Sequence, residues 1–155
     1  MNDTNTMNEE DLTAPGREMQ RRLRRAMRGD SSAFDELLGR LRLLFAAEER
    51  WLYPEFAAGA GEGRRAAWLQ KLAGEHHCMI GLIDRLLQLG PDAGETPALL
   101  ATLQAMLAAH VREERALLAA GLEAGLADPS GRLSRFGERA WRTIAQGSLE
   151  PAPYL

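Results

Sequence analysis

The chain has 155 residues, of which 45% are hydrophobic and 26% are charged, and its formal net charge is −3. This length and apolar content predict a single domain with a hydrophobic core. The acidic balance argues against nucleic acid as a partner, and the single cysteine excludes an internal disulfide bond. No run reaches the roughly 18 apolar residues that a membrane-spanning helix needs, so we expect a cytoplasmic protein with no membrane partner.

The N-terminal segment is polar and acidic, and we expect residues 1–12 to form a disordered leader ahead of Pro15. The first helix is expected at residues 14–28 and carries six arginines. Such a run is typical of a solvated helix face, although it would also suit an anionic surface.

Three longer helices are expected at residues 31–58, 65–89 and 96–125, because each has an apolar stripe at helical spacing and ends at a glycine-rich break. A shorter fifth helix follows Gly131. The predicted fold is all-α: an up-and-down antiparallel four-helix bundle over residues 13–126, an appended C-terminal helix within 127–147, and a tail over 148–155.

One segment occurs twice, 65 positions apart, as residues 45–52 and 110–117. Both copies contain Glu-Glu-Arg followed two positions later by Leu. His110 and Glu114 lie four positions apart on a helix, so their side chains share a face and could reach one metal ion. The other copy has Phe45 in place of the histidine and keeps only the carboxylate of Glu49.

Four polar residues from three predicted helices fall on otherwise apolar stripes, and these are the predicted metal ligands: Glu49, His76, His110 and Glu114. A buried carboxylate without a partner costs several kcal/mol, so a metal ion, an arginine or a protonated histidine must compensate it. An ion pair among these residues is the alternative to a metal site. His77 is expected to be a surface or interface residue, and Cys78 to behave as a small hydrophobe rather than a redox-responsive thiol.

These residues resemble the hemerythrin-like HHE cation-binding family. The resemblance lies in Glu48-Glu49-Arg-Trp-Leu-Tyr53-Pro54, in Glu75-His76, and in His110-Val-Arg-Glu113-Glu114, and covers roughly residues 15 to 125. It implies a four-helix bundle around a non-haem di-iron centre held by histidines and bridging carboxylates. The implied roles are oxygen binding, oxygen or redox sensing, and iron handling.

The resemblance implies that Glu49 and Glu114 match the bridging carboxylates and that His76 and His110 match two of the histidines. Phe45 stands where the family has a second-helix histidine, and the first helix has none, with Met19 expected to face the site. Two histidines and two carboxylates suit one iron or zinc ion better than two ions.

The sequence therefore predicts a metal-binding protein with an oxygen-sensing, redox-sensing or iron-handling role rather than an enzyme. Its partners would be the metal ion, O₂ or another diatomic molecule, and a second copy or another protein. The alternative is a metal-free bundle that acts as a protein-interaction or dimerisation module.

Overall fold

The computed structural model describes residues 9–30, 33–58, 64–124, 131, 133 and 135–147, and every regular element among them is helical. The elements in chain order are α1 (Glu9–Ala26), α2 (Phe34–Ala47), the π-helical turn η1 (Glu48–Leu52), α3 (Tyr53–Ala58), α4 (Arg64–Leu89), α5 (Thr96–Glu123) and α6 (Phe136–Gln146). None of these helices is long and apolar enough to cross a membrane.

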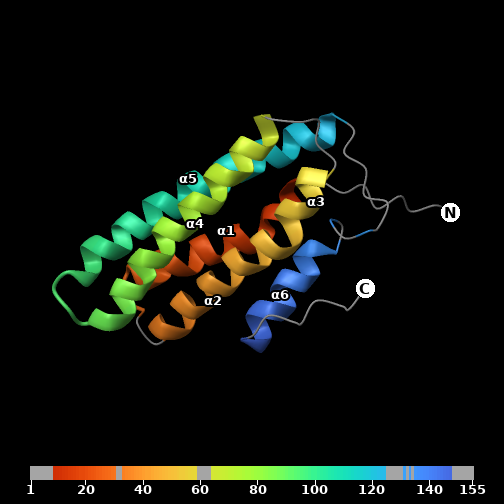
Figure 1. Ribbon diagram of the computed structural model, residues 1–155. Helices are drawn as coiled ribbons and strands as arrows, with labels where there is room; N and C mark the ends of the chain where they lie inside the picture. Colours follow the sequence, from red (N-terminus) through yellow and green to blue (C-terminus); the bar gives the residue numbers. More distant parts are fainter. Residues whose placement is uncertain are drawn as a thin grey trace.

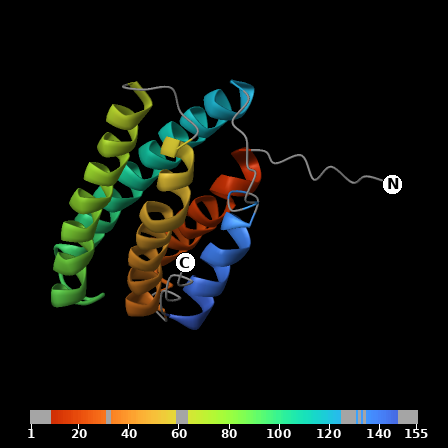
Figure 2. The ribbon, with the colours of Figure 1, turned by 45° about the vertical axis from the view of Figure 1, so that its right-hand side comes forward.

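The four long helices alternate in direction and form a bundle, with α1 and α4 each lying between α2 and α5 (Figure 1). The appended helix α6 packs on the outside of the bundle against α1 and α2, as the turned view shows (Figure 2). The predicted all-helical bundle with an extra C-terminal helix is confirmed.

The buried residues of the long helices follow an alternating spacing of three and four, which is the pattern of helices packed nearly parallel to one another. On α4 these residues are Leu69, Leu72, His76, Met79, Ile83 and Leu86, and on α5 they are Leu100, Leu103, Leu107, His110, Glu114 and Leu117. The histidines and Glu114 therefore occupy core positions.

The apolar stripe of α4 is wider than its buried core. Ile80 and Leu87 on α4 are only partly buried, because Met79 and Leu86 take the central positions. The helix contacts bury only the residues that keep the strict three-four spacing. The apolar stripe in the sequence also contains adjacent residues, which are only partly buried.

Helix α1 begins at Glu9, inside the segment that was expected to be a disordered leader. Leu12 is buried in the core, and Arg17 Nη2 donates to the Glu10 carbonyl oxygen over 2.8 Å. Arg115 on α5 pairs with the Glu10 carboxylate at 2.9 Å. These contacts stabilise the helix on the N-terminal side of Pro15, which therefore lies inside α1 rather than at its start. The rest of the expected leader, residues 1–8, and the expected tail lie outside the described residues.

The α2 helix runs into α3 through the π-helical turn η1. The Tyr53 N–H donates to the carbonyl oxygen of Glu48, five residues earlier. Residues five apart therefore lie about one turn above each other here, whereas in an α-helix they are about 140° apart. Single π-helical turns are frequent at functional sites, and this one places Glu48 and Tyr53 on the same face.

Candidate metal centre

Two histidines meet at the centre of the bundle. His76 from α4 and His110 from α5 are both buried, and their Nε2 atoms lie 2.9 Å apart. Each residue sits at a core position of the three-four spacing, so the fold of the two helices sets their approach. The two predicted histidines are thus brought together.

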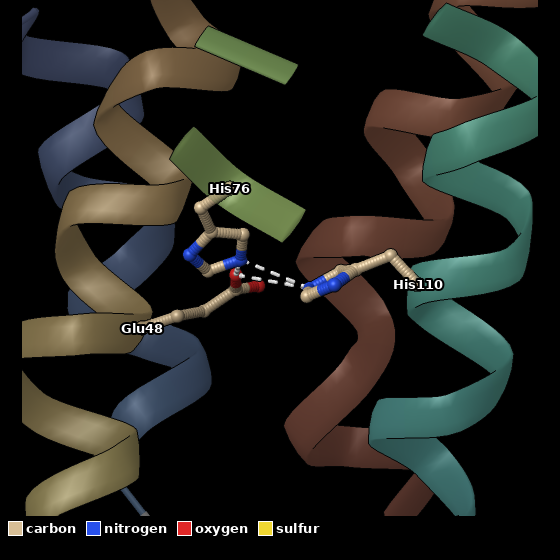
Figure 3. A group of neighbouring side chains, drawn as sticks. All are labelled: Glu48, His76 and His110. Atoms are coloured by element: carbon tan, nitrogen blue, oxygen red, sulfur yellow. Dashed lines mark hydrogen bonds and ion pairs between the residues drawn. The ribbon is translucent and has the colours of Figure 1, made fainter. Parts of the chain in front are cut away.

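The carboxylate nearest to both imidazoles belongs to Glu48 at the start of η1. Its Oε2 lies 3.1 Å from His76 Nε2 and 3.9 Å from His110 Nε2 (Figure 3). The donor atoms of Glu48, His76 and His110 all lie within 4.8 Å of one another, and all three residues are buried. This Glu/His/His group could hold a metal ion.

Glu49, which the sequence placed among the ligands, lies on the outer side of His76. Its side chain is 45% exposed, and its Oε1 is 2.8 Å from His76 Nδ1 rather than near Nε2. Glu75 holds the equivalent position on His110, with Oε2 2.9 Å from Nδ1. An Nδ1–H that donates to each carboxylate leaves the Nε2 lone pairs directed toward one point, as in carboxylate-histidine-metal arrangements.

Glu114 lies in the core beside Tyr53, with which it forms a hydrogen bond. Burial, reinforced by the negative charge of Glu48, raises the pKa of Glu114 well above its usual range. Burial therefore favours the neutral form of this carboxyl.

Tyr53 is the remaining polar group at the centre. Its hydroxyl oxygen lies 3.3 Å from His76 Nε2 and 3.5 Å from His110 Nε2. Burial, together with the charges of Glu114 and Glu48, raises the pKa of Tyr53, so the phenol is neutral in the metal-free protein.

The two imidazoles differ in their affinity for a proton. Burial opposes protonation of both, but the carboxylates of Glu48 and Glu49 outweigh it at His76 and raise its pKa. At His110 burial, together with the positive charge of His76, outweighs the acidic neighbours and lowers the pKa. His76 is therefore the more basic of the two imidazoles.

Phe45 packs against both imidazoles of the group. Its ring stacks on the His76 imidazole, with centroids 4.4 Å apart, and meets the His110 ring edge-on. Helix α1 contains no histidine, and its Met19 is fully buried. The Glu18 carboxylate of α1 forms ion pairs with Arg21 and Arg22 and is not part of the buried group.

The residues present fit one metal ion. Glu48 Oε2 and Glu114 Oε1 are buried and have no hydrogen-bond partner among the described residues, although Glu48 Oε2 is within ion-pair distance of His76. Buried carboxylate oxygens without a donor are costly, and a cation bound by the two Nε2 atoms would neutralise them. The two-ion centre that the resemblance implies is not matched by the donors on α1 and α2.

His77 and Cys78 both lie on the exposed side of α4. The outward orientation expected for His77 is confirmed. Cys78 is an exposed free thiol, because the three-four spacing of α4 turns positions 77 and 78 away from the other helices.

The fold and this buried group together define a helical-bundle domain with a candidate metal centre. The family model of the hemerythrin HHE cation-binding domain matches residues 9–121. The chain therefore belongs to the hemerythrin HHE cation-binding domain family. Comparison with curated proteins found no match, and comparison with solved structures found none either.

Sequence reasoning missed Glu48, Tyr53 and Glu75. Glu48 could have been found, because it continues the three-four spacing of Leu41, Phe45 and Leu52. Aligning the two Glu-Glu-Arg copies favoured Glu49 instead. A regular α-helix would not place Tyr53 beside Glu48, because their proximity depends on the π-helical turn.

Proposed function

We propose that this protein binds a single metal ion between α4, α5 and η1, through His76 Nε2, His110 Nε2 and a Glu48 carboxylate oxygen. Glu114 is a second buried carboxylate inside the bundle. Glu49 and Glu75 orient the two imidazoles. Among the four ligands predicted from the sequence, this proposal keeps the histidines and moves Glu49 to a supporting position. The proposal rests on the fold family and on side-chain geometry.

The observation that carries the proposal is the convergence of the two Nε2 atoms. They lie 2.9 Å apart while both Nδ1 atoms are within 2.9 Å of carboxylates. Two Nε2 lone pairs that face each other repel unless a metal ion or a proton lies between them. A buried carboxylate at 3.1 Å makes the group suitable for a divalent or trivalent ion.

Two histidines and one carboxylate form the ligand set of many non-haem iron sites, which keep further positions open for small molecules. We therefore propose iron as the metal, with zinc as the alternative, and a role in sensing oxygen or redox state. An iron ion at this site would supply a change of oxidation state and an open position for a diatomic molecule. The chain's contribution is to orient the imidazoles, exclude water and keep a second ion out through Phe45.

The test is metal content per chain, measured by elemental mass spectrometry on protein prepared without a histidine tag and loaded with ferrous iron under anaerobic conditions. We expect about one ion per chain in the wild type and loss of that ion in His110→Ala. His77→Ala is the matched control, because His77 is exposed on α4, and it should keep the full metal content. Full metal content in His110→Ala would contradict the proposal.

The metal-free interaction module remains the second candidate, and one observation favours it. The two Nε2 atoms lie 2.9 Å apart, a hydrogen-bond distance, so a proton on one of them satisfies both imidazoles without a metal. On this view the wild type would retain no metal after ferrous loading, and chelator would leave its thermal stability unchanged.

A further inference from the structure

We infer that Tyr53 is a ligand of the bound metal and that its phenolate oxygen makes the site selective for ferric iron. This inference rests on the proposed function and adds a residue and an oxidation state to it. Three features support it: the position of the hydroxyl, the turn that places it there, and the chemistry of the oxygen.

The Tyr53 hydroxyl lies at a ligand's distance from the two imidazole nitrogens. With metal-ligand bonds of about 2.0–2.2 Å, neighbouring donors in tetrahedral or octahedral sites are about 2.8–3.6 Å apart. The Tyr53 oxygen is 3.3 Å and 3.5 Å from the two Nε2 atoms. The Nε2–Nε2 separation of 2.9 Å and the His76–Glu48 separation of 3.1 Å fall in the same range.

The π-helical turn gives this placement a structural origin. The hydrogen bond from the Tyr53 N–H to the Glu48 carbonyl sets these two residues one turn apart on the inner face. In a regular α-helix Tyr53 would point about 140° away from Glu48. The irregular turn therefore brings a second oxygen donor to the group that already contains Glu48.

In the metal-free protein the phenol forms hydrogen bonds within the buried polar group. It is 7% exposed, and its single proton faces Glu114 and two imidazole nitrogens at once. Phenylalanine would fill the same volume without placing a hydroxyl among charged groups. A hard, anionic oxygen donor suits Fe³⁺ better than Zn²⁺ or Fe²⁺.

On ligation the Tyr53 O–H bond breaks and an oxygen-metal bond forms, with no change in oxidation state. The proton released from the phenol passes to the buffer. The ferric state is reached by loading the protein with ferrous iron and oxidising it with ferricyanide, which takes up the electron.

The experiment uses the full chain in its ferric form and compares metal content with the visible absorption and resonance Raman spectra. Ferric phenolate gives a charge-transfer band in the visible region and enhanced tyrosine ring modes. The chain has two tyrosines, Tyr53 and Tyr154, so Tyr154→Phe is the matched control. We expect the band in the wild type and in Tyr154→Phe, and its loss in Tyr53→Phe with about one iron per chain retained.

The outcomes separate this inference from the proposed function. One ferric ion per chain without a phenolate band, or a band that persists in Tyr53→Phe, overturns the role of Tyr53 and leaves the proposed metal site standing. Absence of bound iron overturns both. If Tyr53→Phe does not fold, deuteration of the tyrosine rings in the wild type decides instead: the enhanced modes must shift if a tyrosine is the ligand, and absence of a shift contradicts the inference.

Discussion

At the scale of single residues, the chemistry depends on which of two adjacent glutamates faces the histidines. Glu48 is buried with its carboxylate near both Nε2 atoms, whereas Glu49 reaches His76 Nδ1 from the exposed side. The two residues therefore have different roles: Glu48 would bind the ion directly, and Glu49 would orient a ligand.

The pair provides a matched test of this assignment. Glu48→Gln is expected to weaken metal binding more than about 100-fold, because it removes a charged ligand from the buried group. Glu49→Gln is expected to cost about 10–100-fold, the usual effect of losing a partner that orients a ligand. Competition with chelators of known affinity measures both. Equal losses, or a larger loss in Glu49→Gln, would contradict the assignment.

A second residue-scale prediction concerns Glu18, which accepts hydrogen bonds from Arg22 and Arg21 on the surface of α1. These contacts lower its pKa below the usual glutamate value. A carboxyl with a lowered pKa in the folded state stabilises the protein above its unfolded-state pKa, and the effect is lost as the pH falls through the folded-state value.

Glu18→Gln should therefore lower the free energy of unfolding by about 0.5 kcal/mol at pH 7 and by almost nothing near pH 3, since exposed ion pairs contribute little. Urea denaturation at the two pH values measures the difference. An equal difference at both values would show that the ion pairs do not contribute as described.

The candidate site was only partly predictable from the sequence. His76, His110 and Glu114 stand on three-four core stripes, and each is buried as that spacing predicts. Glu48 also lies on such a stripe, but alignment of the two Glu-Glu-Arg copies matched Glu49, not Glu48, to Glu114. Tyr53 carried no signal, because the side on which it lies follows from a backbone irregularity that side-chain periodicity does not encode.

At the scale of elements, the helix that carries Glu48 is held in place from both sides. Trp51 in η1 lies beneath the Arg139 guanidinium of α6, which is 5.1 Å from its ring centroid. On the other side, Phe56 of α3 packs directly against Gly121 of α5. These contacts anchor η1 and α3 on the bundle and fix the position of the site carboxylate.

Gly121 tests this packing. A Cβ atom at this position would lie 2.1 Å from Phe56 Cζ, so Gly121→Ala forces a buried ring to move and should lower the free energy of unfolding by about 1–3 kcal/mol. Gly81 is the control, because it lies on the exposed side of α4 with nothing within 4 Å of an added Cβ. Gly81→Ala should instead raise the free energy of unfolding by up to about 1 kcal/mol, because alanine favours the helix more than glycine does. Thermal and urea denaturation measure both, and equal effects would contradict the packing.

The start of α1 shows that amino-acid composition alone does not predict where this helix begins. Residues 9–12 are as polar as a disordered leader, yet they are helical because Leu12 enters the core and Glu10 binds arginines of α1 and α5. These contacts join residues far apart in the chain, so a local pattern could not predict them. The four bundle helices were predictable, because each carries its own apolar stripe and ends at a glycine-rich break.

At the scale of the whole molecule, a metal ion held by α4, α5 and η1 links three segments of the bundle. An ion that binds only the folded state stabilises it, by about 2.7 kcal/mol at a free concentration 100 times its Kd. Removing the metal with a chelator should therefore lower the Tm by several degrees. His110→Ala is the control, since chelator should leave its Tm unchanged. An unchanged wild-type Tm would favour the metal-free module.

The most direct test of the central claim is a crystal structure of the iron-loaded protein with anomalous diffraction data collected at the iron edge. The account predicts one anomalous peak per chain, within about 2.0–2.3 Å of His76 Nε2, His110 Nε2 and a Glu48 carboxylate oxygen. Two peaks would show that Phe45 does not prevent a second ion from binding. A peak elsewhere, or no peak in protein loaded with iron, would contradict the metal centre itself.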